Sequence, residues 1–176
     1  MVLPIVLYGS SVLRKKAFEI DKGDNFKELA ANMSLTLKSA RGIGLAGPQV
    51  GVLKHIFIID TTLLKEDGIE SVEKVCINPQ IKNFSDNKGY YNEGCLSIPG
   101  IFEDISRPEK VEVRYRDEFF DWHEEIFDGI VARIFQHEYD HLQGILFIDR
   151  LSSLRKRMLR GKLKSIRKNV HLNYKN

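Results

Sequence analysis

Two histidines in the last third of the chain have the spacing that suits a metal ion. In QHEYDH (136–141), His137 and His141 are four residues apart, and Glu138 directly follows the first of them. Residues four apart project from one side of an α-helix, so the two imidazoles could hold one ion, with Glu138 placed to take a proton from a bound water. The alternative, two ordinary helix histidines, leaves this glutamate unexplained.

A catalytic metal site usually has three protein ligands, so a third must come from elsewhere in the chain. Thermolysin-like peptidases supply a later glutamate, but no glutamate follows Glu138, and Phe147 stands where a metzincin has its third histidine. The upstream candidates are Cys76, Cys95, His55 and His123. We favour Cys95, because the glycine and proline residues of NEGCLSIPG (92–100) predict a loop that brings its thiol to an ion. The apolar run around Cys76 is typical of a buried structural thiol.

The segments around these residues predict an α+β fold. An amphipathic helix is expected in DNFKELAANMSLTLKSA (24–40), with Asp24 or Asn25 at its start, and a second helix between Asp128 as N-cap and Gly144 as the residue after its end. Strands are expected in HIFIID (55–60), KVCINPQI (74–81), KVEVRYRD (110–117) and FFDWHEEIFD (119–128), the last two as a hairpin. Strands followed by a late helix predict short antiparallel sheets packed around a central metal-binding helix.

The charge is divided unevenly along the chain. Residues 150–176 hold ten of the 27 Lys and Arg and none of the 24 Asp and Glu, so residues 1–149 carry a net charge of −7. We expect residues 1–150 to form one catalytic domain, and residues 151–176 to form a basic helix or tail rather than a second domain. The tail predicts an anionic partner, or else a helix that packs through Leu151, Leu154 and Met158 while its charges face solvent.

Composition also indicates a compartment. The sequence contains no apolar run long enough to span a membrane, and its opening MVLPIVLYG lacks the basic segment and cleavage site of a secretory signal. The chain has two cysteines, Cys76 and Cys95, and we expect both to be reduced thiols in a cytoplasmic protein that does not bind a membrane.

Three motifs together resemble one known family. GIGLAGPQ (42–49), EGCLS (93–97) and QHEYDH (136–141) are similar to the three motifs of peptide deformylase, in its order, and LPIVLYGSSVLRKKA (3–17) is similar to the start of that family. The resemblance implies an α+β fold and removal of the formyl group from the initiator methionine of new polypeptides. It implies one divalent ion, physiologically Fe²⁺, with Zn²⁺, Ni²⁺ or Co²⁺ able to occupy the site. N-formylmethionyl peptides would be the partners, and DNA would not.

The resemblance also implies roles for individual residues. Hydroxide on the metal would attack the formyl carbon, and Glu138 would move the proton from water to the departing amine. The backbone N–H of Leu96 and the side chain of Gln49 would stabilise the oxyanion. Without the motif, Gln49 would be read as an amide that organises the turn at Pro48. Glu93 and Arg107 resemble an ion pair that fixes the EGCLS segment without touching substrate.

Substrate binding is expected through backbone pairing and an apolar pocket. The peptide would pair as an added strand with Ile43, Gly44 and Gly94. The resemblance places the methionine pocket at Ile43, Ile130, Arg133, Ile134 and His137. Of these, Arg133 is expected to line the pocket with its methylene stem while its charge stays in water.

One position departs from the family, and two other functional classes stay open. The family usually reads G-x-G-L-A-A, but Gly47 stands at the second alanine, and the missing methyl should loosen the packing near Gln49 slightly. A metallopeptidase could use the same two histidines, and a binding module could act through the basic tail. In bacterial deformylases a basic C-terminal helix can bind the ribosome near its exit tunnel, which this tail resembles in charge and position only.

Overall fold

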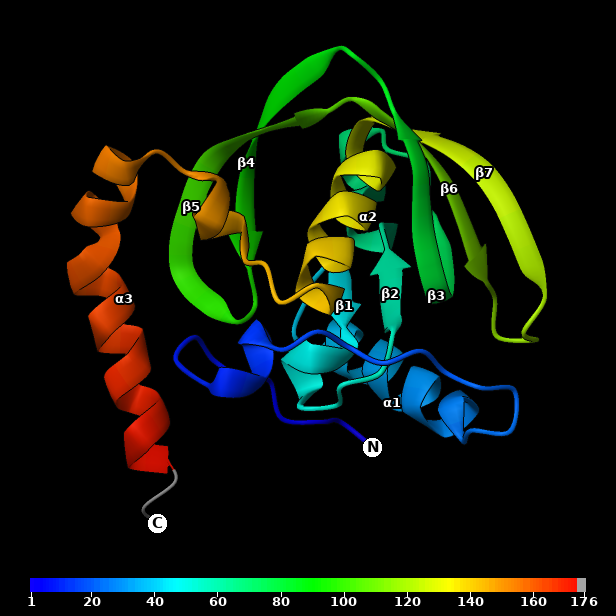
Figure 1. The fold of residues 1–176 in the computed structure, drawn as a ribbon, viewed down its shortest axis with the longest axis horizontal. Helices are drawn as coiled ribbons and strands as arrows, with labels where there is room; N and C mark the ends of the chain where they lie inside the picture. The colour runs from blue at the N-terminus through cyan, green and yellow to red at the C-terminus, as the bar shows by residue number, and fades with distance from the viewer. Residues whose placement is uncertain (174–176) are drawn as a thin grey trace.

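The computed structural model describes residues 1–173, over which the chain builds two antiparallel sheets and three α-helices (Figure 1). The strands are β1 (Gly44–Ala46), β2 (Ile56–Asp60), β3 (Glu73–Phe84), β4 (Lys88–Cys95), β5 (Ile98–Pro108), β6 (Lys110–Arg116) and β7 (Trp122–Asp128). The α-helices are α1 (Phe26–Ser39), α2 (Gly129–Leu142) and α3 (Ser153–Asn173), and the short 3₁₀ helices are η1 (Ser11–Arg14), η2 (Gly47–Val50), η3 (Thr62–Asp67) and η4 (Phe147–Arg150). The predicted α+β class is confirmed.

The two sheets are connected by two paired segments of the chain, one running from β3 to β4 and the other from β5 to β6. The larger sheet has the order β1-β2-β3-β6-β7, and β4 pairs with β5 alone. The ribbon of β3 and β6 continues into β4 and β5 over the arch at the top of Figure 1, where the N–H of Ser85 donates to the carbonyl of Lys110 and the N–H of Glu109 to that of Asn87, each at 3.0 Å. The predicted hairpin of β6 and β7 is confirmed, with Lys110 opposite Asp128 and Arg116 opposite Trp122.

Helix α2 lies between the two sheets (Figure 1). It begins after Asp128 and ends before Gly144, whose φ of 73° is the left-handed conformation that glycine adopts most easily. Its position explains why ten of its 14 residues are buried. Six of those ten are polar or charged, namely Arg133, Gln136, His137, Glu138, Asp140 and His141. Buried polar groups are costly without partners, so this helix must carry a built polar site.

Three apolar clusters hold the layers together. The first joins α2 to the larger sheet through residues such as Phe57 and Phe135, whose rings lie edge to face at 4.9 Å. The second packs α1 on the same sheet through Met33 and Leu37. The third joins the β4–β5 hairpin to η4, η1 and α3. Helix α2, which carries His137 and His141, and the β4–β5 hairpin, which carries Cys95, are thus each held in place by an apolar cluster.

The C-terminal helix α3 packs along the outside of the β4–β5 hairpin (Figure 1). It runs unbroken through Gly161, and it buries Leu159 and Ile166 in the third cluster. The expected contact through Leu154 and Met158 is wrong, since these side chains are 63% and 64% exposed. Residues 174–176 of the predicted tail lie outside the described residues. Among the described residues, no helix has the length and apolarity to span a membrane.

Candidate active site

The three predicted metal ligands come together in the structure. The ligand atoms of Cys95, His137 and His141 all lie within 4.8 Å of one another, and the Cys95 Sγ is 3.3 Å from His141 Nε2. Both imidazoles are buried, and Cys95 is half-buried. Cys76 is fully buried in the first apolar cluster, away from this group. Both cysteines are free thiols, as expected.

The end of β4 positions Cys95. Cys95 lies opposite Ile98, and the register between β4 and β5 shifts between Glu93 and Cys95. A β-bulge of this kind re-aims the side chain that follows it, here toward α2. The expected loop around Cys95 is therefore wrong in form, because residues 88–108 are a hairpin with a turn only at Leu96 and Ser97. The alternation of β5 was missed because its buried side includes Glu103 and Arg107, which are charged.

Gln49 is held with its amide nitrogen toward the thiol. The N–H of Ala46 donates to Gln49 Oε1 at 2.8 Å, which orients the amide. The Nε2 of Gln49 then lies 3.4 Å from Cys95 Sγ and 3.4 Å from the Ser97 hydroxyl oxygen. The turn of η2, which begins with Gly47 and Pro48, supplies this position. The oxygen of Gln49 thus organises the turn, while its nitrogen faces the site and is free to take the role of a hydrogen-bond donor there.

Glu138 enters the same cavity from α2. Its side chain is 3% exposed, and its Oε2 has no hydrogen-bond partner in the structure. Gly44 on β1 leaves room for it, because a Cβ there would lie 2.4 Å from Glu138 Oε1. Burial raises the pKa of Glu138 to about 7, although the charges of His137 and Arg107 oppose this shift. The site therefore contains a buried carboxyl group that can exchange a proton near neutral pH.

Glu93 fixes the ring of His137. Its Oε2 is 2.9 Å from His137 Nδ1, which leaves the Nε2 of that ring to face the thiol group. Arg107 donates to both Glu93 oxygens, at 2.7 and 3.0 Å, and to Asp140 at 2.7 Å. Burial alone would raise the pKa of Glu93, but the hydrogen bonds from His137 and Arg107 hold it at about 2. A carboxylate behind a ligating histidine orients the ring and raises its basicity.

Arg133 closes one end of the cleft. Its guanidinium donates to Glu93 at 3.0 Å, to the Ile105 carbonyl at 2.9 Å and to the Gly89 carbonyl at 2.8 Å. The expectation that its charge stays in water is therefore wrong, because the residue is 8% exposed and its head is paired inside the protein. Charge-assisted hydrogen bonds to a buried carboxylate and two backbone carbonyls stabilise the guanidinium inside the protein.

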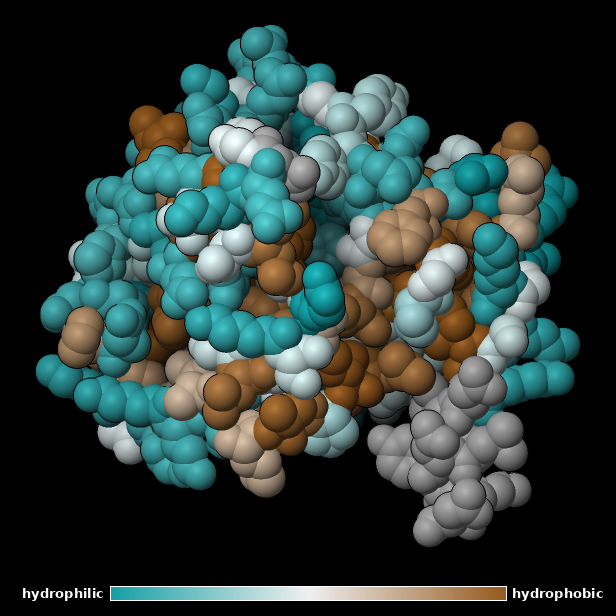
Figure 2. All heavy atoms as spheres, turned by 180° about the vertical axis from the view of Figure 1, so that it is seen from behind, coloured by the Kyte–Doolittle hydropathy of each residue, from teal (hydrophilic) through white to brown (hydrophobic). Residues whose placement is uncertain are grey.

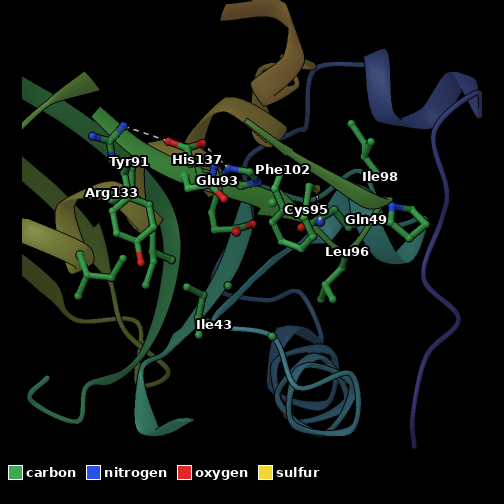
Figure 3. A pocket seen from close by; sticks show the side chains of 18 of the residues that line it. Ile43, Gln49, Tyr91, Glu93, Cys95, Leu96, Ile98, Phe102, Arg133 and His137 are labelled. Atoms are coloured by element: carbon green, nitrogen blue, oxygen red, sulfur yellow. Dashed lines mark hydrogen bonds and ion pairs between the residues drawn. The ribbon is translucent and has the colours of Figure 1, made fainter. Parts of the chain in front are cut away.

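The cleft has a volume of about 430 Å³. Figure 3 shows Arg133 and Tyr91 at one end, Cys95, Gln49 and Leu96 near the other, and Ile43 along one side. All six residues predicted to bind substrate line it, namely Ile43, Gly44, Gly94, Ile130, Arg133 and Ile134. Glu93, His137 and Glu138 line it too, whereas Arg107 lies behind it. Figure 2 shows the molecule hollowed between the body and the side that bears α3, with hydrophobic residues beside the hollow.

The packing around Gly47 is tight, whereas its missing methyl group predicts looser packing. Gly47 is buried, and a Cβ there would lie 2.7 Å from the Lys54 carbonyl oxygen and 2.8 Å from that of Val52. The N–H of Val52 donates to the Gly47 carbonyl at 3.0 Å. The expectation was wrong because the carbonyl groups of Val52 and Lys54 occupy the space that a methyl would fill.

Several site residues were missed in the sequence. Asp140 joins Arg107 to Arg150, whose Nε donates to it at 2.7 Å. Tyr91 and Phe102 line the cleft, and Phe102 covers Gly94 so closely that a Cβ there would lie 2.5 Å from its ring. The signal for Asp140 was available, because a carboxylate on a central helix needs a buried cation. The position of Phe102 depends on the unrecognised hairpin.

The donor set fits a divalent metal ion. One cysteine sulfur and two imidazoles converge on a space where Glu138 Oε2 has no protein partner, and such ligands suit Zn²⁺ and first-row transition metals. An ion held by these three protein ligands would keep a position for water or substrate. Three protein ligands beside a cleft are the pattern typical of catalytic rather than structural metal sites.

Comparisons with known proteins agree with this geometry. The model of the polypeptide deformylase family matches residues 2–157. A peptide deformylase of Cytophaga hutchinsonii is 46% identical over 96% of this chain and 92% of its own, and one of Christiangramia forsetii is 43% identical over 99% and 95%. The crystal structure of a peptide deformylase from Legionella pneumophila superposes with a TM-score of 0.84 at 35% identity, covering 96% of each chain.

Proposed function

This chain belongs to the peptide deformylase family, and on that premise we propose that it removes the N-formyl group from the initiator methionine of newly made polypeptides. Cys95, His137 and His141 would hold one divalent ion, physiologically Fe²⁺, and the same donor set accepts Zn²⁺, Ni²⁺ or Co²⁺. The reaction takes place in the cytoplasm, where both thiols stay reduced.

Glu138 is the proton carrier in this proposal. When bound, a divalent ion would polarise the formyl carbonyl and acidify a water in the site. Glu138 takes the proton of the attacking water at a carboxylate oxygen and passes it to the departing amine. Its unpartnered Oε2 and its pKa of about 7 support this role, because a general base works best with a pKa near the working pH.

Gln49 and the backbone N–H of Leu96 stabilise the oxyanion that forms from the formyl oxygen. The amide of Gln49 is already oriented by its bond to Ala46, so it need not reorganise during the reaction. Leu96 follows the metal ligand in the turn of the hairpin and lines the cleft. Preorganised donors of this kind are worth roughly 10²–10³-fold in rate each.

The substrate binds as an extended strand between β1 and β4. Each of these strands has a free edge at the cleft, at Ile43 and Gly44 on one side and at Gly94 on the other. The methionine side chain enters the apolar end between Ile130 and Ile134, and the stem of Arg133 closes that end. Glu93 and Arg107 support the ligands from behind.

The converging Cys95, His137, His141 and Glu138 carry this proposal, and a substrate comparison tests it. Metal-replete protein should release formate from formyl-Met-Ala-Ser and leave the peptide bonds intact. Unformylated Met-Ala-Ser should be unchanged, which separates the proposal from a metallopeptidase. Peptide-bond cleavage, or no formate from a protein with one metal per chain, would contradict it.

The basic face of α3 supports a second part of the proposal, contact with the ribosome. Leu159, Leu163 and Ile166 face the body, so the charged side chains Arg157, Arg160, Lys162, Lys164, Arg167 and Lys168 are left exposed. A cationic face without acidic neighbours on its helix fits a polyanion such as ribosomal RNA.

Charge removal tests this contact without undocking the helix. A variant with Arg157, Arg160 and Lys164 changed to Gln should lose co-sedimentation with ribosomes at low salt, with a shallower dependence of log affinity on log salt. The control changes Lys22, Lys27 and Lys82, which are exposed elsewhere, and removes the same charge. Equal co-sedimentation by the two variants would show that the charges of α3 merely face solvent.

A further inference from the structure

A second groove lies beside the cleft, between the β4–β5 hairpin and the start of α3. It has a volume of about 510 Å³. Its lining residues are Tyr90, Asn92, Phe102, Glu103, Asp104, Ser106, Arg150, Leu151, Ser152 and Arg155. Asn92 and Phe102 line both this groove and the cleft, so the two hollows share one rim.

The groove has a polar floor between two exposed aromatic rings. On the floor, the amide of Asn92 donates to the Asp104 carboxylate at 2.8 Å. Asp104 lies opposite Asn92, while Tyr90 lies two residues before Asn92 and Phe102 two residues before Asp104, so all four share one face of the hairpin. Tyr90 is 78% and Phe102 64% exposed. The rings therefore stand at opposite ends of the floor.

Asp104 is a carboxylate of the groove that no direct ion pair engages, although the charge of Arg155 acts on it at longer range. The guanidinium of Arg155 is paired through two hydrogen bonds with Glu103, at 2.7 and 3.0 Å, and that of Arg150 with Asp140, at 2.7 and 2.6 Å. Among the residues whose side chains the structure describes (1–66 and 68–168), Asp104 takes part in no ion pair within 4 Å. A carboxylate between aromatic rings suits a long side chain with an apolar stem and a cationic head.

Strand β4 connects the predicted metal site to this groove. Asn92 precedes the ligand Cys95 by three residues, which is about 10 Å along a strand. Consider a peptide that lies along the free edge of β4 with its formyl-methionine residue opposite Cys95. Its fourth residue then lies opposite Asn92. Tyr91 faces the cleft and Tyr90 the groove, so side chains on this path alternate between the two hollows.

We propose that this groove binds the substrate downstream of its third residue and favours a lysine or arginine at the fourth. This inference rests on the proposed function, because it assigns a further contact to the same peptide. The stem of the basic side chain lies between Tyr90 and Phe102, and its head pairs with Asp104. The enzyme then contacts and selects for more of the nascent chain than its methionine.

Peptide length and charge test the proposal on the metal-replete enzyme. We expect kcat/KM for formyl-Met-Ala-Ser-Lys-Ala to exceed that for formyl-Met-Ala-Ser by roughly five- to tenfold, mainly through KM, which lies within the range of one exposed cation–π contact and one exposed ion pair together. The same peptide with Glu in place of Lys should gain less than twofold. The double variant Tyr90→Ala, Asp104→Asn should lose the gain and keep kcat/KM for the tripeptide within twofold, since neither residue lines the cleft.

A matched control and the opposite outcomes make the test decisive. Phe119→Ala removes an equally exposed aromatic side chain before β7 and should leave the gain intact. The proposal is overturned if the lysine peptide gains nothing, if the glutamate peptide gains as much, or if the double variant keeps the gain. Failure of the proposed function looks different, because then the tripeptide itself is not deformylated.

Discussion

Gly47→Ala should damage this enzyme, because the surrounding backbone leaves no room for a methyl group. The added Cβ would lie 2.7 and 2.8 Å from two backbone carbonyl oxygens, those of Lys54 and Val52, and neither can rotate away as a side-chain tip could. Overpacking of a buried site costs about 1–3 kcal/mol. For a chain of this size, that lowers the melting temperature by roughly 2–12 °C.

The same substitution should reduce turnover through Gln49. Gly47 begins the turn that carries Gln49, and a shift of this turn moves the amide from its place 3.4 Å from Cys95 Sγ. We expect kcat/KM for formyl-Met-Ala-Ser to fall roughly tenfold, a part of the 10²–10³ that an oxyanion donor is worth. In a Gln49→Ala background, Gly47→Ala should then have little further effect on kcat/KM.

Gly161→Ala is the matched control for this prediction. Gly161 is exposed on α3 with no atom within 4 Å of an added Cβ, so the change should stabilise the helix by about 0.5–1 kcal/mol and leave turnover unchanged. Thermal unfolding and steady-state assays of both variants are needed. A Gly47→Ala protein with the stability and kcat/KM of the unchanged chain would refute the reasoning from close backbone contact.

Two other perturbations test the thiols and a buried histidine. Cys95→Ala should lose stoichiometric metal in elemental analysis, whereas Cys76→Ala should keep its metal and lose roughly 1–2 kcal/mol of stability; an active, fully loaded Cys95 variant would show that the third ligand is another residue. Burial, aided by the charge of Lys16, lowers the pKa of His55 to about 4, so between about pH 6.5 and 4 the unfolded chain binds a proton that the folded chain does not. Stability should therefore fall by up to about 3 kcal/mol as the pH drops through this window, and His55→Gln should remove that part of the slope in unfolding measurements. Parallel pH profiles for the two proteins would contradict this assignment.

The metal ligands could be predicted from the sequence more completely than the strands and helices that position them. A spacing of four residues on a helix fixes where His137 and His141 point, and the failure of both peptidase patterns led to Cys95. Local periodicity likewise located α2 and the hairpin of β6 and β7. These features depend on neighbours in the sequence, which is why they could be read from it.

Features that depend on distant segments were not predictable in the same way. Two apolar stripes compete along α3, and only the position of the β4–β5 hairpin decides that Leu159 and Ile166 are buried while Met158 is exposed. The guanidinium of Arg133 turns inward because Glu93 and two carbonyls of the hairpin lie there. The hairpin itself was missed because its buried face includes charged residues, and these pair with α2 rather than with each other alone.

The most direct test of the account is the activity of a Glu138→Gln variant with its metal in place. The amide fills the same volume beside Gly44 and leaves Cys95, His137 and His141 unchanged, so the protein should bind one metal per chain. An amide cannot carry the proton, and turnover of formyl-Met-Ala-Ser should fall by roughly 10²–10⁴-fold. Loss of rate with full metal content is the predicted result. Near-normal formate release by the metal-replete variant would contradict the central claim that Glu138 moves the proton at a Cys95–His137–His141 site.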